Sequence, residues 1–171
     1  MQSNLDFRLM SLIYKLRDFF RPRNSILREV GIKPGFTVLD YGCGPGSYVI
    51  PTAELVDKSG KVYALDVHPL AVKSVEHITA KKRLTNVETI QSDCKTGLPD
   101  TSVDVVLLYD LFHDLADPDG VLAEVHRVLK QDGVLSLSDH HLKEDGIVSG
   151  VTKSGLFKLL RKGKRTYSFG K

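Results

Sequence analysis

The sequence predicts an α/β fold in which a mostly parallel β-sheet carries helices on both faces. Apolar segments of strand length alternate with longer segments of helical periodicity through most of the chain. The strand segments are continuously apolar, as in VVLL at 105–108, which is typical of strands buried on both faces. Because the 171 residues contain no internal repeat and no low-complexity linker, we expect residues 25–171 to form one domain.

The N-terminal part predicts two helices before the first strand. Apolar residues at helical spacing favour an amphipathic helix over 4–20, which Pro22 ends. A second, short helix over 25–30 is closed by Gly31. The turn KPG at 33–35 then leads into the first strand over 38–41.

The rest of the chain alternates strands and helices and ends in a hairpin. We expect strands over 61–66, 86–93, 103–110 and 133–139. Helices are expected over 48–56, 70–83, 118–130 and 144–154, with Asp117 as the cap of the third. The last segment predicts two strands around the turn KGK at 162–164, which add an antiparallel strand to the sheet.

Composition is that of a globular protein, with 42% apolar and 26% charged residues. No apolar run approaches the roughly 20 residues that span a bilayer. Asp6 and Arg8 interrupt the apolar N-terminus, which argues against a signal peptide. Two cysteines, Cys43 and Cys94, form no disulfide framework, so we expect a cytoplasmic protein.

The C-terminal tail is more basic than the rest of a chain whose net charge is only +3. Such a tail forms either a patch for nucleic acid or an anionic substrate, or a solvated surface, and we favour the solvated surface. The basic residues are Lys158, Arg161, Lys162, Lys164, Arg165 and Lys171.

A glycine-rich loop follows the first strand in VLDYGCGPGSY, residues 38–48. Gly42 allows backbone angles closed to other residues, Gly44 leaves room for a ligand, and Gly46 lets a helix start tightly against the strand. In doubly wound sheets, ligands bind at the carboxyl ends of the strands, where this loop lies. The spacing G-x-G-x-G lacks the dinucleotide register G-x-G-x-x-G, and no P-loop lysine follows. Tight turns also use glycine, so the loop alone does not identify a ligand.

Carboxylates end each of the first three predicted strands, at Asp40, Asp66 and Asp93. Asp40 suits a group that holds the loop and faces a cation, and Asp66 suits the two hydroxyls of a ribose. Asp93 suits an adenine amino group, with Val67 and Cys94 flanking the ring plane. Each carboxylate alone also fits a surface or capping role.

These motifs together resemble the class I S-adenosylmethionine-dependent methyltransferases, most strongly the ubiquinone/menaquinone-biosynthesis-like group that acts on small molecules. VLDYGCGPGSY resembles the first motif, D-x-G-x-G-x-G, and VYALDVHP the second. IQSDCKTGLP resembles the third, VDVVLLYDLFHDL the fourth strand with its loop, and EVHRVLKQDGVLSLSD the helix and strand that follow. The resemblance covers residues 25–171 and implies a Rossmann-like seven-stranded sheet of order 3-2-1-4-5-7-6.

The resemblance also implies S-adenosyl-L-methionine as cofactor and assigns its ligands. Residues 1–24 would form a helix that caps the cofactor or substrate site, with Tyr14 as its contact. Tyr109 would face the methionine end through its backbone or ring. The expected cofactor-binding residues are Asp40, Gly42, Gly44, Asp66, Val67, Asp93, Cys94, Tyr109 and Tyr14.

Methyl transfer from a sulfonium is an in-line displacement that needs orientation and, for some acceptors, a general base. His113, next to Asp114, and His140, between Asp139 and His141, are the candidate bases, although each also fits a lining or solvated histidine. A metal site built from His113, Asp139 and His140 is an alternative, but its spacing is not diagnostic and we expect no metal.

We expect a small-molecule acceptor, bound in a pocket that Phe19, Leu111 and Phe112 make partly apolar. Methylation of bases in nucleic acid is not favoured, because no NPPY-type segment follows the fourth strand. Two alternatives stay open: a methyltransferase that acts on RNA or protein through the basic hairpin, and a cofactor-binding protein without turnover. Both a monomer and a homodimer fit the sequence.

Overall fold

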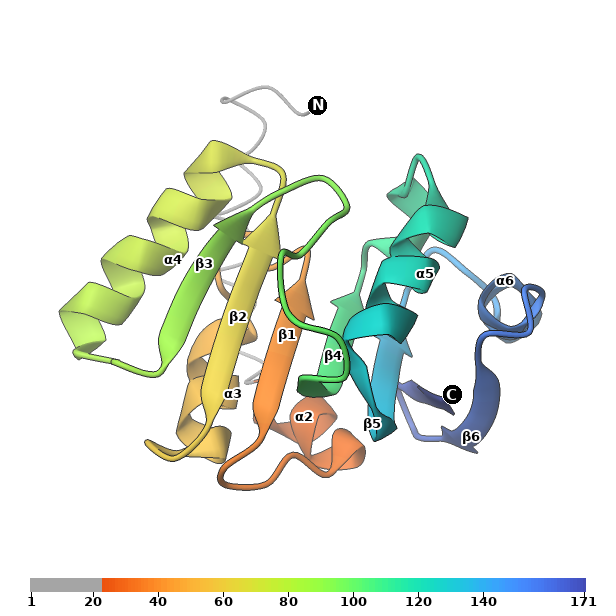
Figure 1. Ribbon diagram of the computed structural model, residues 1–171, viewed down its shortest axis with the longest axis horizontal. Helices are drawn as coiled ribbons and strands as arrows, with labels where there is room; N and C mark the ends of the chain where they lie inside the picture. Colours follow the sequence, from red (N-terminus) through yellow and green to blue (C-terminus); the bar gives the residue numbers. More distant parts are fainter. Residues whose placement is uncertain (1–22) are drawn as a thin grey trace.

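The fold is built on a seven-stranded sheet of order β3-β2-β1-β4-β5-β7-β6, seen in a computed structural model that describes residues 23–171 (Figure 1). The first five strands pair in parallel, and β7 is antiparallel to both β5 and β6. The predicted fold class and strand order are confirmed. The strands are β1 (Thr37–Tyr41), β2 (Lys61–Asp66), β3 (Val87–Gln91), β4 (Val103–Tyr109), β5 (Leu129–Ser138), β6 (Lys158–Lys162) and β7 (Tyr167–Gly170).

Helices cover both faces of this sheet. On one face, α2 (Asn24–Val30), α3 (Val49–Val56) and α4 (Pro69–Lys82) bury their apolar residues in a common cluster with the strands. On the other face, α5 (Pro118–Val128) and α6 (Glu144–Thr152) do the same. Figure 1 shows α5 in front of the sheet and α3 behind it. The sheet is therefore the middle layer of three.

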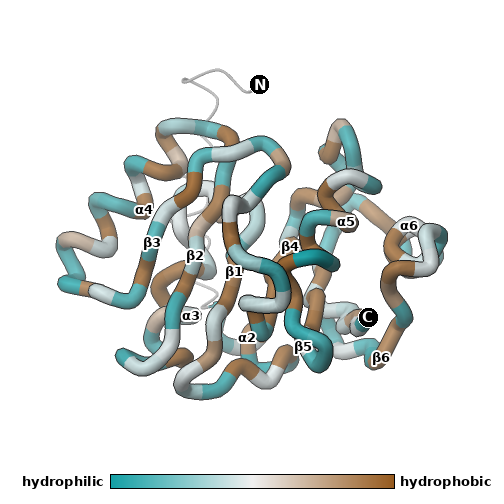
Figure 2. Tube along the Cα trace, in the orientation of Figure 1, coloured by the Kyte–Doolittle hydropathy of each residue, from teal (hydrophilic) through white to brown (hydrophobic). Residues whose placement is uncertain are grey.

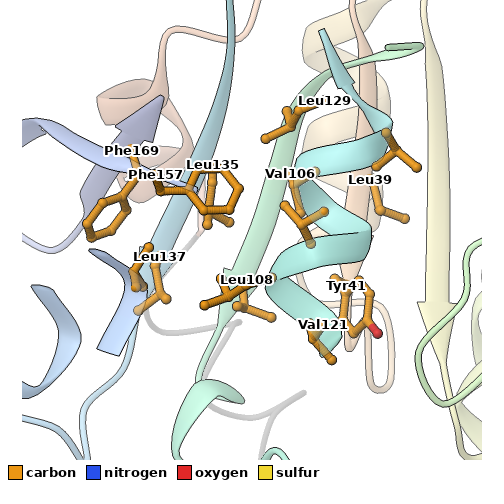
Figure 3. Close-up of a cluster of buried hydrophobic side chains, with 14 of the residues drawn as sticks. Leu39, Tyr41, Val106, Leu108, Val121, Leu129, Leu135, Leu137, Phe157 and Phe169 are labelled. Carbon is orange, nitrogen blue, oxygen red and sulfur yellow. The ribbon is translucent and has the colours of Figure 1, made fainter. Parts of the chain in front are cut away.

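Alternation of side chains along β4 explains why both faces need cover. Val106 and Leu108 point into the cluster under α5, whereas Val105 and Leu107 point into the cluster under α2 and α3. All four are at most 1% exposed. Figure 3 shows the first cluster, in which Leu108 meets side chains of β1, β5 and α5. Hydrophobic residues follow the central strands, while hydrophilic ones lie along the outer helices and loops (Figure 2).

The boundary between α5 and β5 differs from the prediction. We expected a helix over 118–130 and a strand from 133, but α5 ends at Val128 and β5 already begins at Leu129. Leu129 has extended backbone angles, pairs with Val103 of β4 and is fully buried. Pairing with the neighbouring strand therefore overrides the helical periodicity of the segment. A short 3-10 helix, η1 (Phe112–Asp114), was not predicted.

Several N-terminal predictions lie outside the described residues. These are the helix over 4–20, its end at Pro22, Phe19, the cofactor contact Tyr14 and all of the 1–24 cap except Arg23 and Asn24. In the part of the chain from residue 23 onward, no helix has the length and apolar character needed to cross a membrane.

One polar network holds the loop after β3 against α5. The Glu124 carboxylate accepts hydrogen bonds from the Thr96 backbone N–H at 2.8 Å and the Thr96 hydroxyl at 2.6 Å. Arg127 donates two more to the same carboxylate, at 2.7 and 2.9 Å. The hydrogen bonds from Arg127, together with those from Thr96, lower the pKa of Glu124 to about 2, against the opposing effect of burial. The loop that carries Asp93 and Cys94 is thus fixed by a charged contact.

We expect Glu124→Gln to remove much of the acid sensitivity of the fold. Because the pKa of Glu124 falls from 4.5 to about 2 on folding, its stabilisation is complete above pH 4.5 and lost as the pH falls through 2. The difference in free energy of unfolding between wild type and variant should shrink by about 2–3 kcal/mol from pH 6 to pH 2. Urea denaturation at several pH values measures it.

Glu88→Gln is the matched control, because the Glu88 side chain is 58% exposed and pairs with Lys61 on the surface. The difference in free energy of unfolding between Glu88→Gln and wild type should stay nearly constant over the same pH range. If both variants follow the same pH curve, the Glu124 network does not stabilise the fold.

Candidate functional site

The glycine-rich loop after β1 adopts the backbone that its sequence predicts. Gly42 and Gly44 have φ of +81° and +51°, in the left-handed region that favours glycine. A Cβ on Gly42 would lie 2.4 Å from Leu111 Cδ2, so the loop also needs glycine for close packing. A Cβ on Gly44 would meet nothing within 4 Å. The two glycines thus differ: Gly42 lets the chain pack, and Gly44 leaves open space.

Asp66, the last residue of β2, holds this loop. Its Oδ2 accepts a hydrogen bond from the Gly44 backbone N–H, and its Oδ1 accepts one from the His68 backbone N–H, both at 2.8 Å. His68 in turn caps α4 by accepting from the Leu70 N–H at 3.2 Å. An ionised carboxylate has about four acceptor positions. Asp66 therefore keeps acceptor capacity for a further donor while it fixes two backbone segments.

Asp40 is a buried carboxylate in β1 that is only 2% exposed. Its Oδ2 is buried and has no hydrogen-bond partner among the described residues. Burial, with repulsion from Asp66, raises the pKa of Asp40 from 3.8 to about 7. An unpartnered buried acceptor is costly in a folded protein. Asp40 is thus placed to accept a hydrogen bond from a donor or cation at the glycine loop.

The adenine-binding candidates gather at the next strand ends. Asp93 is exposed and Cys94 half-buried in the loop after β3, and Val67 is 48% exposed directly after Asp66. The Tyr41 hydroxyl donates a hydrogen bond to the Cys94 carbonyl at 2.9 Å and so fixes this loop. Burial raises the pKa of the Cys94 thiol, which favours the neutral form. The role of Tyr41 in fixing this loop was not predicted. Tyr41 directly follows Asp40 in β1, so its side chain points to the opposite face of the sheet.

Tyr109 lies at the end of β4, as expected, but its side chain is engaged within the fold. The hydroxyl is 2.9 Å from the Ser136 hydroxyl, and the ring meets the Tyr48 ring edge-on at 4.8 Å. Burial raises the pKa of Tyr109. The ring packs between sheet and α3.

Three histidines meet at the carboxyl ends of β4 and β5. His113 Nδ1 lies 2.8 Å from Asp139 Oδ2, and the His113 backbone N–H donates to the same oxygen at 3.0 Å. His140 Nδ1 lies 2.8 Å from Asp110 Oδ1. The His141 ring bridges them, with centroids 4.2 Å from that of His113 and 4.0 Å from that of His140. The two candidate bases are thus brought into one cluster, each with its own carboxylate.

The two carboxylates of this cluster are held in different ways. The Asp139 side chain is fully buried; burial acts to raise its pKa, but hydrogen bonds from His113 and His141 outweigh it and lower the pKa. Asp110 has a left-handed backbone with φ of +53°, a strained conformation that is frequent at functional sites. Asp139, and not the adjacent Asp114, is the hydrogen-bonded partner of His113.

The metal alternative is not supported. Within residues 23–171, no group of three or more histidine, cysteine, aspartate or glutamate side chains has the arrangement that holds a metal ion. Of His113, Asp139 and His140, the first two pair with each other, whereas His140 pairs with Asp110.

An open pocket of about 530 Å³ adjoins the histidine cluster. The ends of β4 and β5, the α6 region, the β6–β7 turn and the start of α2 and α3 enclose it. The lining differs from the expected acceptor pocket, because Phe112 is buried in the core and Leu111 packs on the glycine loop. The basic turn between β6 and β7, which carries Lys164 and Arg165, was not expected to line this pocket. Its lining residues are Arg23, Ile26, Tyr48, Asp110, Ser138, Asp139, His140, Leu142, Ile147, Lys162, Gly163, Lys164, Arg165 and Tyr167.

Comparisons with known proteins agree with this geometry. The methyltransferase domain family matches residues 32–168. The demethylmenaquinone methyltransferase of Geobacillus stearothermophilus is 31% identical over 122 residues, which cover 71% of this chain and 52% of that protein. The aklanonic acid methyltransferase of Streptomyces sp. (strain C5) is 31% identical over 115 residues, 66% of this chain and 52% of that protein. The chain spans about half the length of these curated relatives.

Among solved structures, a SAM-dependent methyltransferase from Aquifex aeolicus superposes with a TM-score of 0.77 at 29% identity, covering 91% of this chain and 95% of that one. The matched region contains the glycine loop, all three strand-end carboxylates and the histidine cluster. The chain therefore belongs to the methyltransferase domain family.

Proposed function

We propose that this protein binds S-adenosyl-L-methionine and transfers its methyl group to a small-molecule acceptor. One observation carries the proposal: a buried carboxylate, Asp40, has an unpartnered oxygen beside a glycine loop that is open at Gly44. The sulfonium and the α-ammonium group of this cofactor are cations that such a carboxylate would favour. The family match and the quoted relatives support the same reading.

The residues of the carboxyl edge fit the parts of this cofactor. Asp40, with Gly42 and Gly44, would hold the cationic methionine part. Asp66 keeps acceptor capacity for the ribose hydroxyls while it binds Gly44. The chemistry of the remaining candidates suits a purine. Val67 offers an exposed aliphatic side chain, Cys94 a half-buried thiol and Asp93 an exposed carboxylate.

The N-terminal segment and the end of β4 complete the proposal. Residues 1–24 would cover the site as a helical cap, with Tyr14 as a cofactor contact. Tyr109 would contribute through its backbone. Cys43 and Cys94 are both free thiols, which is consistent with action in the cytoplasm.

The bound cofactor supplies an activated methyl group, and the chain supplies orientation and a base. His140 lines the pocket, and Asp110 holds its Nδ1. When Nδ1–H is donated to a carboxylate, the Nε2 atom of neutral histidine is an acceptor. His140 can then take the proton that a hydroxyl, amine or acidic carbon loses on methylation. His113 is held in the same way by Asp139 and is the second candidate base.

We expect the affinity for S-adenosylmethionine to rise about tenfold from pH 6 to pH 8. The ionised form of Asp40 grows by about that factor across a pKa of about 7, and a cationic ligand favours the ionised form. Titration calorimetry at each pH measures it, and the Asp40→Asn variant should give a flat profile. Comparison with S-adenosylhomocysteine, which lacks the sulfonium charge, shows whether Asp40 faces sulfur or the ammonium group.

Asp132→Asn, at an exposed position of β5, is the control and should keep the wild-type profile. No binding of either ligand at millimolar concentration, or an unchanged pH profile in Asp40→Asn, would contradict the proposed role of Asp40.

The raised pKa of Asp40 also predicts how the stability of the ligand-free protein depends on pH. The folded chain retains a proton on Asp40 that the unfolded chain loses above its ordinary pKa of 3.8, so the free energy of unfolding falls as the pH rises from about 4 to 7. At pH 8, Asp40→Asn should therefore be more stable than wild type by about 2–4 kcal/mol, and at pH 4 the two should be close. Urea denaturation measures both; equal differences at the two pH values would refute the buried charge.

We expect His140→Gln to reduce kcat by about 10²–10⁴ for an acceptor that must lose a proton. The affinity for S-adenosylmethionine should stay within about twofold, because the histidine does not contact the glycine loop. His113→Gln separates the two candidate bases, and His77→Gln, exposed on α4, is the control. The assay follows a labelled methyl group into an acceptor panel that begins with demethylmenaquinone, the substrate in the name of a relative.

Two outcomes separate the alternatives. Cofactor binding without product from any acceptor would indicate a binding protein without turnover. Wild-type kcat in both histidine variants would show that neither His113 nor His140 acts alone as the base.

A further inference from the structure

We propose that the pocket beside the histidine cluster takes an acceptor that carries an acid group, held by Lys164 and Arg165 of the β6–β7 turn. The inference rests on the proposed methyl transfer and names the class of its acceptor. It starts from the charges that line the pocket and from the way the turn is held.

Most of the charged groups in the pocket wall already have partners. Asp110 and Asp139 are each hydrogen-bonded to a histidine. Lys162 is hydrogen-bonded to Glu144. Arg23 also lines the pocket and lies over the Tyr48 ring, with its guanidinium carbon 5.5 Å from the ring centroid. Lys164 and Arg165 line the pocket as well, and their side chains make no ion pair within residues 23–171. The pocket therefore has an excess of positive charge at one end.

The turn that carries these cations is fixed by α2. Glu29 Oε2 accepts hydrogen bonds from the Arg165 backbone N–H and the Thr166 hydroxyl, both at 3.1 Å. The Arg161 guanidinium donates to the Glu29 carbonyl, and the Gly163 N–H donates to the Thr166 carbonyl at 2.7 Å. Glu29 thus binds the backbone of the turn. The Lys164 and Arg165 side chains stay exposed and available to a ligand anion.

Apolar side chains form part of the wall and suit a small molecule. They are those of Ile26, Leu142 and Ile147, together with the ring of Tyr167. A volume of about 530 Å³ is within the range of small-molecule sites. An acceptor bound by its acid group at Lys164 and Arg165 would direct its other end toward the histidine cluster. A concave, partly apolar pocket favours this ligand over RNA, which would need an extended basic surface.

The test uses two fluorescent probes with the same anilinonaphthalene skeleton: 1-anilinonaphthalene-8-sulfonate, which is anionic, and N-phenyl-1-naphthylamine, which is neutral. Each is titrated into the full chain saturated with S-adenosylhomocysteine, so that the cofactor site is closed to the probe. We expect the sulfonate to bind at least about tenfold more tightly, the size of one charge-assisted hydrogen bond.

The double variant Lys164→Glu/Arg165→Glu should weaken sulfonate binding at least about tenfold and change binding of the neutral probe by less than about twofold. The control Lys73→Glu/Lys158→Glu makes the same change in net charge at exposed positions outside the pocket and should leave both affinities unchanged. Circular dichroism and S-adenosylhomocysteine affinity check that both variants keep the fold.

Three results would overturn the inference: equal binding of the two probes by wild type, no binding of the sulfonate, or the same loss in the control as in the double variant. A 20-nucleotide RNA that binds wild type but not the double variant, with no sulfonate binding, would assign the turn to nucleic acid instead. Probe binding can also be measured without cofactor, so a failure of S-adenosylhomocysteine to bind counts against the proposed function and not against the acid-binding turn.

Discussion

Parallel pairing of the first five strands is the constraint on which the site depends. Because β1 to β5 run in one direction, their carboxyl ends meet at one edge of the sheet. The loops that leave those ends carry the glycines, the carboxylates and the histidines. Asp66 joins two of these loops through its hydrogen bonds to Gly44 and His68. Residues from Asp40 to His140 are thereby placed along one edge without any local sequence relation.

The carboxylates discussed above fall into two groups, according to whether hydrogen-bond donors stabilise their negative charge. Glu124 and Asp139 have several hydrogen-bond donors, and their pKa values are lowered. Asp40 has an oxygen without a donor in the described residues, and its pKa is raised. A fold that satisfies its other buried carboxylates and leaves this one incomplete stores an unfavourable interaction, which a cationic ligand would relieve. The cofactor-binding proposal is the physical reading of that difference.

The antiparallel end of the sheet gives the pocket its chemistry. Because β7 runs against β5, the β6–β7 turn returns to the edge where β5 ends. Basic residues of the β6–β7 turn therefore line the same pocket as His140, which follows β5. Glu29 of α2 fixes the turn by accepting hydrogen bonds from Arg165 and Thr166. In our proposals the common fold supplies the cofactor edge, and the β6–β7 hairpin binds the acid group of the acceptor.

The sequence by itself determined the layers of this protein and predicted the edge at which we propose that the cofactor binds, because both follow from local patterns. Apolar periodicity predicts strands and helices, and a glycine loop with strand-end carboxylates is readable in order along the chain. Only the tertiary structure decided the boundary at Leu129, the pairing of His113 with Asp139 and the place of Lys164 and Arg165 in the pocket wall. These contacts join residues that are 26 or more positions apart. Their partners are chosen by strand order and packing, which residue spacing does not encode.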